Sequence, residues 1–554
     1  MLQPVQVLDL IIILAIVLLS AWLISPYIVR IFTRAPSRLD RFLNPIENLI
    51  YRVTGVDPKR MMGWKEYFLS ALFLNFVQMV IAFFILAFQG RLPLNPQGFP
   101  GLSWDLSLNT VISFATNTNL QHYAGEVSLS YLSQISAIQF LQFTSAATGI
   151  CCGIAMVRGF VTHSKDLGNF YVDFVRALTR LFIPLCILAA LAFVYLGVPQ
   201  TLSGYTAVKT VEGATQYILV GPVASLVSIM QLGTNGGGYY GANSAYPLQN
   251  PSPESDLLQI FLMLLLPTAL CFVFGEFIGK KRESTPMIVG AYVLFGIDLA
   301  IAYIPTPVLI GPGIETRFGG FMSTFWTVVT TAVTTGSVNS SLAGMHPLAI
   351  LSAFMGMLIQ ATPGGKGVGL MYLIMYVIIT IFIVGLMSGR TPEYLGIKIG
   401  ARDVKLVMIT FLIHPMIIII PTVIAYASGA AAAIGIGTDS VGFTQILYEF
   451  TSAAANNGSD FLGTAANTPF FNVATAIVIF VGRYAPIACL LALAGSMIGR
   501  KRAEASESSL KTHTFAFSFI LVASILILVV LTFFPFLALG PILAFFQGHV
   551  NFFG

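Results

Sequence analysis

The sequence predicts an all-α polytopic membrane protein with ten transmembrane helices and four membrane–pore–membrane repeats. Three observations support this fold class: the composition, ten long apolar stretches, and four short polar segments that echo one another. The 554-residue chain is 56% hydrophobic and only 9% charged, whereas a soluble domain has about 25% charged residues. We therefore expect most of the chain to lie in a lipid bilayer. The net charge of +5 does not indicate nucleic-acid binding, because the basic residues are scattered between apolar spans.

Ten stretches satisfy the requirement of about 20 mostly apolar residues for a spanning helix. They cover residues 8–30, 66–89, 130–157, 175–197, 256–279, 285–305, 349–389, 404–428, 470–499 and 513–541. The first stretch is too long and too weakly basic at its start for a signal peptide. Five cysteines lie inside apolar stretches, where we expect them to pack between helices and form neither disulfides nor zinc sites.

The seventh stretch is too long for one straight helix. Its middle, Ala361–Gly369, contains Pro363 and four glycines, which cannot form a regular helix. Irregular backbone at membrane depth is tolerated only where it lines a cavity or is buried in protein. We therefore expect a broken helix at this position.

The distribution of basic residues predicts the orientation. With the N-terminus outside, most of the 28 Lys and Arg residues fall in inner segments, and the outer segments hold only Arg91, Lys209 and Arg317. This bias predicts that both termini lie outside. The predicted organisation is a first transmembrane helix with a basic inner linker (1–65), four repeats (66–158, 170–282, 285–390 and 402–502) and a last transmembrane helix (511–546).

The four echoing segments lie on the predicted outer face at intervals of roughly 100–120 residues. Each follows a short apolar segment (103–115, 221–232, 320–332 and 438–454) that is long enough for a half-helix only. Aligned on Thr118 and on glycines 236, 336 and 458, the candidate site residues are Thr116, Asn117, Thr118 and Gln121; Thr234, Asn235, Gly236 and Gly237; Thr334, Thr335, Gly336 and Ser337; and Asn456, Asn457, Gly458 and Ser459.

One such polar cluster alone would indicate an ordinary loop, but four in register indicate a pore with pseudo-fourfold symmetry. The half-helix C-termini carry partial negative charge and favour a cation. No carboxylate lies in the loop cores, and neutral carbonyl and hydroxyl oxygens suit a monovalent ion such as K⁺. We therefore predict a potassium-channel-like selectivity filter made of backbone carbonyls. The first loop departs from the others, because Thr118 stands where they have glycine.

The chain resembles the A-subunit family (KdpA) of the Kdp P-type potassium-transporting ATPases. The similarity extends over essentially the whole chain and is carried by four strings: Thr116–Gln121, Gly233–Ser244, Gly389–Gly396 and Asn456–Gly463. The resemblance implies a K⁺-binding subunit in a prokaryotic plasma membrane. It also implies three partners, the P-type ATPase KdpB, which hydrolyses ATP, and the small single-span proteins KdpC and KdpF.

The motifs that are absent agree with this division of labour. The chain has no complete Gly-x-x-x-x-Gly-Lys-[Ser/Thr] motif, because Gly364-Gly365-Lys366-Gly367 lacks the upstream glycine and the hydroxyl residue. It has no Asp-Lys-Thr-Gly string either. We expect this subunit to be non-hydrolytic on its own, with ATP used only by the partner.

Ionisable residues within spans are functional candidates by default. Lys366, with Gly364, Gly365 and Gly367, is a candidate gate beneath the filter, and Arg483 is a candidate electrostatic barrier. The alternative for Arg483 is a structural pair with a carboxylate or carbonyls, and the alternative for Lys366 is a polar residue in a wet cavity. Among the other ionisable residues, we expect Glu126, Glu276 and Glu449 to be interfacial or capping residues, Asp298 to pair with a basic residue, and His414 to pack between helices.

One other functional class remains open. A stand-alone K⁺ channel or ion-coupled K⁺ transporter could share the same repeats, although the first and last spans and the four strings favour the pump subunit. Co-purification of a P-type ATPase chain would discriminate between them. A membrane-embedded enzyme is disfavoured, because the spans contain no nucleophile–base pair or metal cluster in the sequence pattern.

Overall fold

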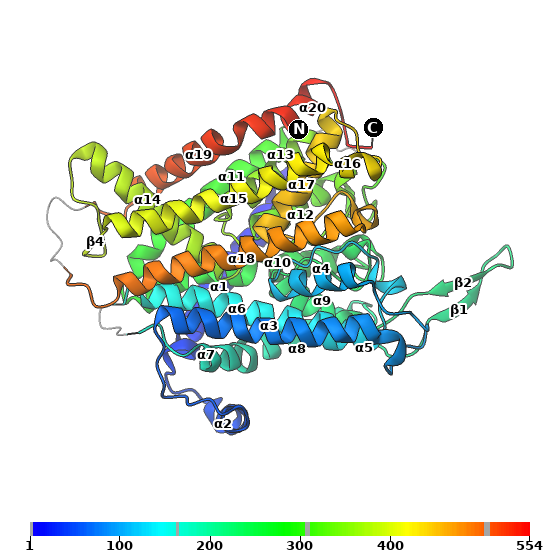
Figure 1. Cartoon of the computed structure of the whole chain (residues 1–554), viewed down its shortest axis with the longest axis horizontal. Coiled ribbons are helices and arrows are strands. Elements are labelled where there is room, and N and C mark those ends of the chain that lie inside the picture. The colour runs from blue at the N-terminus through cyan, green and yellow to red at the C-terminus, as the bar shows by residue number, and fades with distance from the viewer. Residues whose placement is uncertain (1–3, 162–165, 305–310, 503–509, 554) are drawn as a thin grey trace.

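The computed structural model describes residues 4–161, 166–304, 311–502 and 510–553, and it is almost entirely helical (Figure 1). Within these residues ten helical stretches are long and apolar enough to cross a bilayer, which confirms the predicted number of spans. The helices that form them are α1 (Pro4–Thr33), α3 (Trp64–Phe88), α5 and α6 (Tyr131–Ser133, Phe140–Arg158), α7 and α8 (Phe170–Ala177, Ile183–Tyr195), α10 (Pro253–Phe277), α11 (Ser284–Tyr303), α14 (Val368–Ser388), α15 (Ala401–Ala427), α18 (Pro469–Met497), and α19 and α20 (Phe515–Leu537, Leu543–Phe546).

Four shorter helices precede the echoing polar segments. They are α4 (Trp104–Ala115), α9 (Val223–Leu232), α12 (Gly319–Ala332) and α17 (Ser440–Ala455). At 1.5 Å per residue the longest, α17, is about 24 Å long, too short to cross a hydrocarbon core of about 30 Å. Most of their residues are buried. These helices confirm the predicted half-helices, and each ends within one residue of its predicted end.

The predicted seventh stretch is two helices separated by a break. The first, α13 (Pro347–Ile359), ends at Gln360, which has a left-handed backbone with φ 53°. Residues 360–367 are not helical, and α14 begins at Val368. Only α14 is long enough to span, so the glycine-rich segment does interrupt the helix as predicted.

Two strand pairs and two short helices lie outside the spans. The strands β1 (Thr206–Lys209) and β2 (Thr215–Ile218) form an antiparallel hairpin that projects from the right-hand end of the bundle, and β3 (Glu393–Tyr394) pairs with β4 (Ile397–Lys398). The helices α2 (Asp40–Thr54) and α16 (Ala430–Ala433) are the other two short elements. In Figure 1, α2 lies below α7 and is seen almost end-on.

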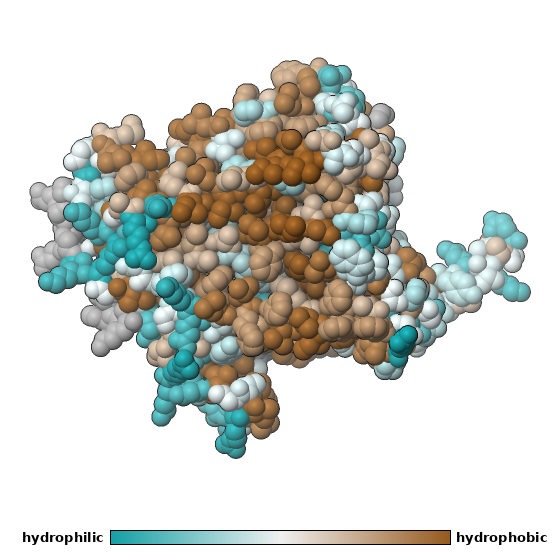
Figure 2. Space-filling view, viewed as in Figure 1, coloured by the Kyte–Doolittle hydropathy of each residue, from teal (hydrophilic) through white to brown (hydrophobic). Residues whose placement is uncertain are grey.

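The surface and the interior are arranged for a bilayer. Figure 2 shows hydrophobic residues over the middle of the visible face, while hydrophilic residues gather at the left-hand end and on the hairpin. The interior holds many buried Ser, Thr, Asn and Gln side chains on and around the half-helices. The five cysteines are free, and all but the half-buried Cys489 are buried, as expected for packing residues.

Candidate ion-binding site

All four half-helices end in the same backbone turn. The first residue of each turn has a positive φ, between 41° and 69°. Its N–H donates to the carbonyl three residues earlier, at 3.0–3.2 Å. The N–H of the next residue donates to the carbonyl five residues earlier, at 2.7–2.9 Å. The residues in the first position are Asn117, Thr234, Thr334 and Asn456, and those in the second are Thr118, Asn235, Thr335 and Asn457.

This hydrogen-bond pattern corrects the predicted alignment of the first loop by one residue. Asn119, not Thr118, occupies the position of Gly236, Gly336 and Gly458. Asn119 has φ 58°, which is positive like φ 89° at Gly336 and 97° at Gly458. Asparagine tolerates a left-handed backbone better than most residues. The first loop therefore needs no glycine there, and alignment by residue type alone was wrong.

Backbone carbonyls from different loops converge on one point. A Cβ atom added at Gly236 would lie 2.5 Å from the Thr335 oxygen, 2.8 Å from the Asn457 oxygen and 2.9 Å from the Thr118 oxygen. These three oxygens occupy the same position in three loops. A Cβ at Gly336 would overlap the Asn457 oxygen, and one at Gly458 would overlap the Thr118 oxygen. Glycine is needed because neighbouring carbonyls leave no room for a side chain.

The asparagine side chains tie neighbouring loops together. Asn117 Nδ2 donates to the Thr234 carbonyl at 2.7 Å, and Asn457 Nδ2 donates to the Thr330 carbonyl at 3.1 Å. Asn456 Nδ2 donates to Thr118 Oγ1 at 2.9 Å. These amides are therefore engaged in holding the loops, which leaves backbone oxygens as the candidate cation ligands.

The remaining predicted residues also brace the loops. Gln121 reaches the second loop, where Oε1 accepts from Gly238 N at 3.0 Å and Nε2 donates to Gly238 O at 3.3 Å. The other contacts are Thr116 Oγ1 to Thr118 Oγ1 at 2.9 Å, Asn235 Nδ2 to Ile229 O at 3.2 Å, Gln142 Nε2 to Gly237 O at 2.8 Å, Ser337 Oγ to Gln231 Oε1 at 3.1 Å and Ser459 N to Asn457 Oδ1 at 3.1 Å.

Sequence reasoning missed Asn243 as a site residue. Its Nδ2 donates to the Gly236 carbonyl at 2.8 Å, so this residue fixes the second loop. The sequence offers a weak signal for it, since Asn243 stands in a polar string shortly after the loop.

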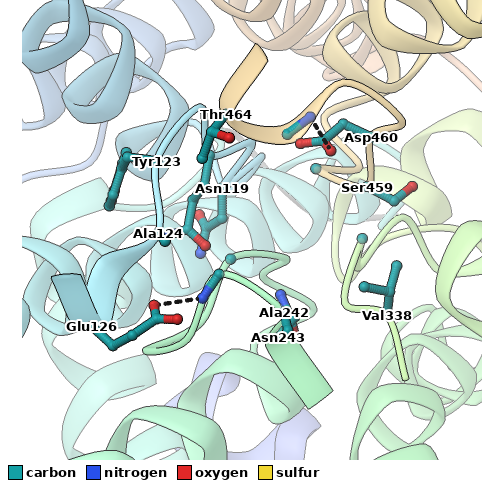
Figure 3. Close-up of a pocket in the computed structure, with 16 residues that line it drawn as sticks. Asn119, Tyr123, Ala124, Glu126, Ala242, Asn243, Val338, Ser459, Asp460 and Thr464 are labelled. Atoms are coloured by element: carbon teal, nitrogen blue, oxygen red, sulfur yellow. Dashed lines mark hydrogen bonds between the residues drawn. The ribbon is translucent and has the colours of Figure 1, made fainter. Parts of the chain in front are cut away.

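A cavity of about 200 Å³ lies against the loops and is lined by residues from all four of them (Figure 3). Asn119 borders this cavity, and neither its Oδ1 nor its Nδ2 has a hydrogen-bond partner among the described residues, although both are buried. Two carboxylates line the cavity as well. Glu126 Oε2 accepts from Gly241 N at 2.7 Å, and Asp460 Oδ1 accepts from Gly463 N at 3.0 Å.

The ionisation of these carboxylates is tuned by burial. Burial raises the pKa of Glu126 above its ordinary value. Burial, reinforced by the charge of Glu449, raises the pKa of Asp460 to about 7. His122 bridges this region, with Nε2 3.0 Å from Glu449 Oε1 and Nδ1 2.7 Å from Asn472 Oδ1. Burial alone would lower the pKa of His122, but the hydrogen bond and charge of Glu449 raise it overall.

The sequence predictions for the other acidic residues are confirmed for some and wrong for others. Glu126 caps a backbone N–H, and Glu276 forms a partly exposed ion pair with Lys281 at 2.7 Å, as expected for capping and interfacial residues. Glu449 is fully buried, so its interfacial prediction was wrong. Asp298 is also buried, and neither carboxylate oxygen has a partner among the described residues, so the predicted basic partner is not found.

The glycine-rich break lies directly against the residues at which the polar loops begin. Gly364 N donates to the Ala332 carbonyl at 2.9 Å. A Cβ at Gly365 would overlap Thr334 Oγ1, and one at Gly367 would overlap the Gly149 carbonyl of α6. Since the half-helices end here, the break is next to the ends of the half-helices and the first residues of the loops.

His414 anchors the entry to this break. Its Nε2 lies 2.6 Å from Gln360 Nε2 and 3.0 Å from the Ala454 carbonyl, and its Nδ1 lies 3.1 Å from the Tyr372 hydroxyl. The residue does lie between helices as predicted, but it also links the two sides of the break to α17.

Two buried basic side chains, those of Lys366 and Arg483, converge at the break. Lys366 Nζ donates to Asn117 Oδ1 at 2.8 Å, so the ammonium group touches the innermost residue of the first loop. A Cβ added at Gly149 would lie 2.8 Å from Arg483 Nη2 and 3.1 Å from the Lys366 carbonyl. Neither side chain forms a salt bridge within the described part of the chain, and Arg483 Nη2 has no hydrogen-bond partner there. The carboxylate pairing considered for Arg483 is therefore not observed.

Known proteins are similar to this chain over nearly its whole length. The potassium-binding subunit of the potassium-transporting ATPase of Caldanaerobacter subterraneus subsp. tengcongensis is 44% identical, covering 96% of this chain and 98% of that protein. The subunit of the same name from Alicyclobacillus acidocaldarius subsp. acidocaldarius is 46% identical, covering 94% of this chain and 95% of that protein. The crystal structure of the potassium transporter TrkH from Vibrio parahaemolyticus has a similar fold, with a TM-score of 0.52 and 16% identity over 88% of this chain and 98% of that chain.

The likeness to TrkH concerns the fold alone. The sequence relatives go further, because they cover nearly the whole of both chains. Residues 11–546 match the KdpA family, described as the potassium-transporting ATPase A subunit. The chain is therefore a multi-pass membrane protein that belongs to the KdpA family.

Proposed function

We propose that this chain is the potassium-binding, non-hydrolytic subunit of an ATP-driven potassium import complex. The observation that carries the proposal is the convergence of the Thr118, Thr335 and Asn457 carbonyl oxygens beside Gly236. Carbonyl oxygens from several loops replace the hydration shell of K⁺ in selectivity filters. The relatives named as potassium-binding subunits support the same assignment.

The proposed filter uses the ends of α4, α9, α12 and α17. Each of these helices presents its C-terminal end, with a partial charge of roughly −0.5, to the start of a loop. A dehydrated cation gains from this field because the surroundings are buried and poorly screened. The asparagine bridges between loops keep the carbonyls at fixed separations, which favours one ion radius over another.

The cavity in front of the loops collects the ion. Glu126 and Asp460 place negative charge on its wall, and Asn119 offers an unpartnered carbonyl oxygen to a partly hydrated K⁺. Neutral oxygens then replace water as the ion enters the filter. In this sequence of events the carboxylates of the cavity attract the cation first, and the carbonyls of the filter then select K⁺ over other ions.

The break at 360–367 closes the path beyond the filter. The Lys366 ammonium lies against Asn117 and the Arg483 guanidinium lies beside Gly149, so an ion leaving the filter inward meets two buried positive charges. In this proposal the ion is diverted to the partner. The ATP-hydrolysing P-type ATPase KdpB performs the pumping, and the single-span proteins KdpC and KdpF complete the assembly, as the resemblance implies.

The membrane orientation and repeat organisation belong to the same proposal. The basic residues favour an inner location for the linker at 34–65 and an outer location for the cavity. Ten crossings then place both termini outside in a prokaryotic plasma membrane. The four repeats, at 66–158, 170–282, 285–390 and 402–502, surround the filter with pseudo-fourfold symmetry, which the shared hydrogen-bond pattern of the four turns supports.

The test is cation binding and co-purification. Purified chain in nanodiscs should bind K⁺ more tightly than Na⁺ in isothermal titration, and affinity-tagged chain expressed from its native locus should retain a P-type ATPase. Equal affinity for the two ions would overturn the filter. A chain that carries K⁺ across liposomes without any ATPase would instead favour a stand-alone channel or an ion-coupled transporter.

A further inference from the structure

The short helix α2 has two chemically opposite faces. Phe42, Ile46, Leu49 and Val53 lie within an arc of about 60° at 3.6 residues per turn. All four side chains are more than half exposed, between 51% and 78%. The opposite face carries Asp40, Asn44, Glu47 and Tyr51.

The polar face is clamped to the bundle by a buried ion-pair cluster. Arg180 Nε lies 2.5 Å from Glu47 Oε1, and Arg180 Nη1 lies 2.5 Å from Asp40 Oδ1. Arg180 Nη2 donates to Asn44 Oδ1 at 2.7 Å, and Arg176 Nη1 lies 3.3 Å from Glu47 Oε2. Because Arg180 and Glu47 are almost fully buried, these contacts fix the rotation of α2. The apolar face is thus held outward.

The depth of α2 matches the edge of the lipid-facing surface. On α8 the first exposed apolar side chain is Ile183, three residues beyond the Arg180 clamp, or about 4.5 Å along a helix. Figure 1 shows α2 end-on beside α7, so its axis crosses the direction of the spans. In Figure 2 hydrophobic atoms lie on the right-hand side of α2, and hydrophilic atoms lie to its left and below.

The surroundings of α2 are strongly basic. Eight exposed basic residues lie before, on and after the helix: Arg30, Arg34, Arg38, Arg41, Arg52, Lys59, Arg60 and Lys65. Both carboxylates of α2 are consumed by the clamp, and Glu66 pairs with Arg60 at 2.5 Å. Basic side chains near an anionic leaflet are attracted to its phosphates, so this cluster favours a negatively charged membrane surface.

We propose that α2 lies in the inner headgroup region of the bilayer and binds anionic phospholipids, with Phe42, Ile46, Leu49 and Val53 in the acyl boundary and the surrounding arginines on the phosphates. An apolar stripe with basic flanks is typical of interfacial helices. The choice of the inner leaflet rests on the proposed orientation, whereas contact with lipid does not.

The first experiment measures the depth of the helix. In the full chain with its five cysteines replaced by alanine, a fluorescent NBD label is placed at Phe42→Cys or at the exposed control Asn48→Cys. Nanodiscs contain phosphatidylcholine and phosphatidylglycerol at a 7:3 ratio, with a shallow nitroxide-labelled lipid. We expect at least twofold stronger nitroxide quenching at position 42 and the reverse order with aqueous iodide. Iodide quenching that is equal at positions 42 and 48, with no nitroxide quenching at position 42, overturns the proposal. Protection of position 42 from iodide only when other subunits are present also overturns it.

The second experiment measures lipid charge and needs no cysteine replacement. The chain purified from mixed nanodiscs or membranes should retain phosphatidylglycerol in excess of the bulk ratio. The triple variant Arg38→Gln, Arg41→Gln and Arg52→Gln should lose at least half of this excess. No enrichment in the unaltered chain overturns the anionic preference. Neither readout involves K⁺, so failure here is distinguishable from failure of the proposed function.

Discussion

Replacing Gly336 by alanine tests the carbonyl filter most directly. Gly336 has φ 89°, and an added Cβ would overlap the Asn457 carbonyl oxygen and approach Ser459 N to 2.7 Å. The substitution therefore has two consequences: backbone strain of about 1–3 kcal/mol, and displacement of one proposed K⁺ ligand. If a lost carbonyl–cation contact is worth as much as a hydrogen bond to a charged group, about 1.5–3 kcal/mol, K⁺ affinity falls about 10- to 150-fold.

A matched glycine separates these two consequences. Gly389 also has a left-handed backbone, with φ 66°, but a Cβ there would meet no atom within 4 Å. Gly389→Ala should lower the thermal stability of the chain through strain while leaving the K⁺ affinity unchanged. Isothermal titration with K⁺ and thermal unfolding in nanodiscs measure the two quantities. Gly336→Ala with the affinity of the unaltered chain, or an equal loss in Gly389→Ala, would refute a filter built from these carbonyls.

Three further results are expected. K⁺ affinity should weaken as the pH falls from 8 to 6, because Asp460, with a pKa of about 7, becomes neutral. Asp460→Asn should weaken K⁺ binding at pH 8 and make the affinity less dependent on pH. Isothermal titration at several pH values checks both results. Lys366→Met and Arg483→Gln should each raise passive ⁸⁶Rb⁺ flux in liposomes by at least tenfold. The reason is that a unit charge at about 6 Å, with an effective dielectric constant of about 20, repels a K⁺ ion by about 3 kcal/mol. If neither variant raises the flux, the barrier lies elsewhere. The purified chain alone should show no K⁺-stimulated ATP hydrolysis in a phosphate-release assay, and activity in a preparation free of other subunits would contradict a non-hydrolytic role.

The fold followed from patterns that act locally. Apolar length and the bilayer thickness determine where spans occur, and the glycine-rich string at 361–369 can end a helix whatever surrounds it. The half-helices were predictable for the same reason, because a short apolar segment before a polar turn has few alternatives in lipid. These features need no knowledge of which helices are neighbours.

The details of the site depend on contacts between distant residues. Asn119 is an exception: its N–H donates to the nearby Ser113 carbonyl at 3.1 Å, and it was missed because alignment by residue type looks for a glycine at this left-handed position. The pairing of His122 with Glu449, more than 300 residues away, is invisible to local patterns. Glu449 was expected at an interface because it lies on a half-helix, yet the fold buries it beside a basic partner.

The contact between Lys366 and Asn117 links the proposed barrier to the proposed filter. Asn117 Oδ1 accepts from the Lys366 ammonium, while its Nδ2 donates to the Thr234 carbonyl of the next loop. A cation at the inner end of the filter and the Lys366 ammonium repel one another, so occupancy of that position weakens the hold of Asn117 on Lys366. By linkage, withdrawal of Lys366 strengthens K⁺ binding at the same position by an equal factor. A partner that displaces the glycine-rich segment would thereby change both the exit route and the affinity of the filter, which is the coupling that an ATP-driven import complex requires.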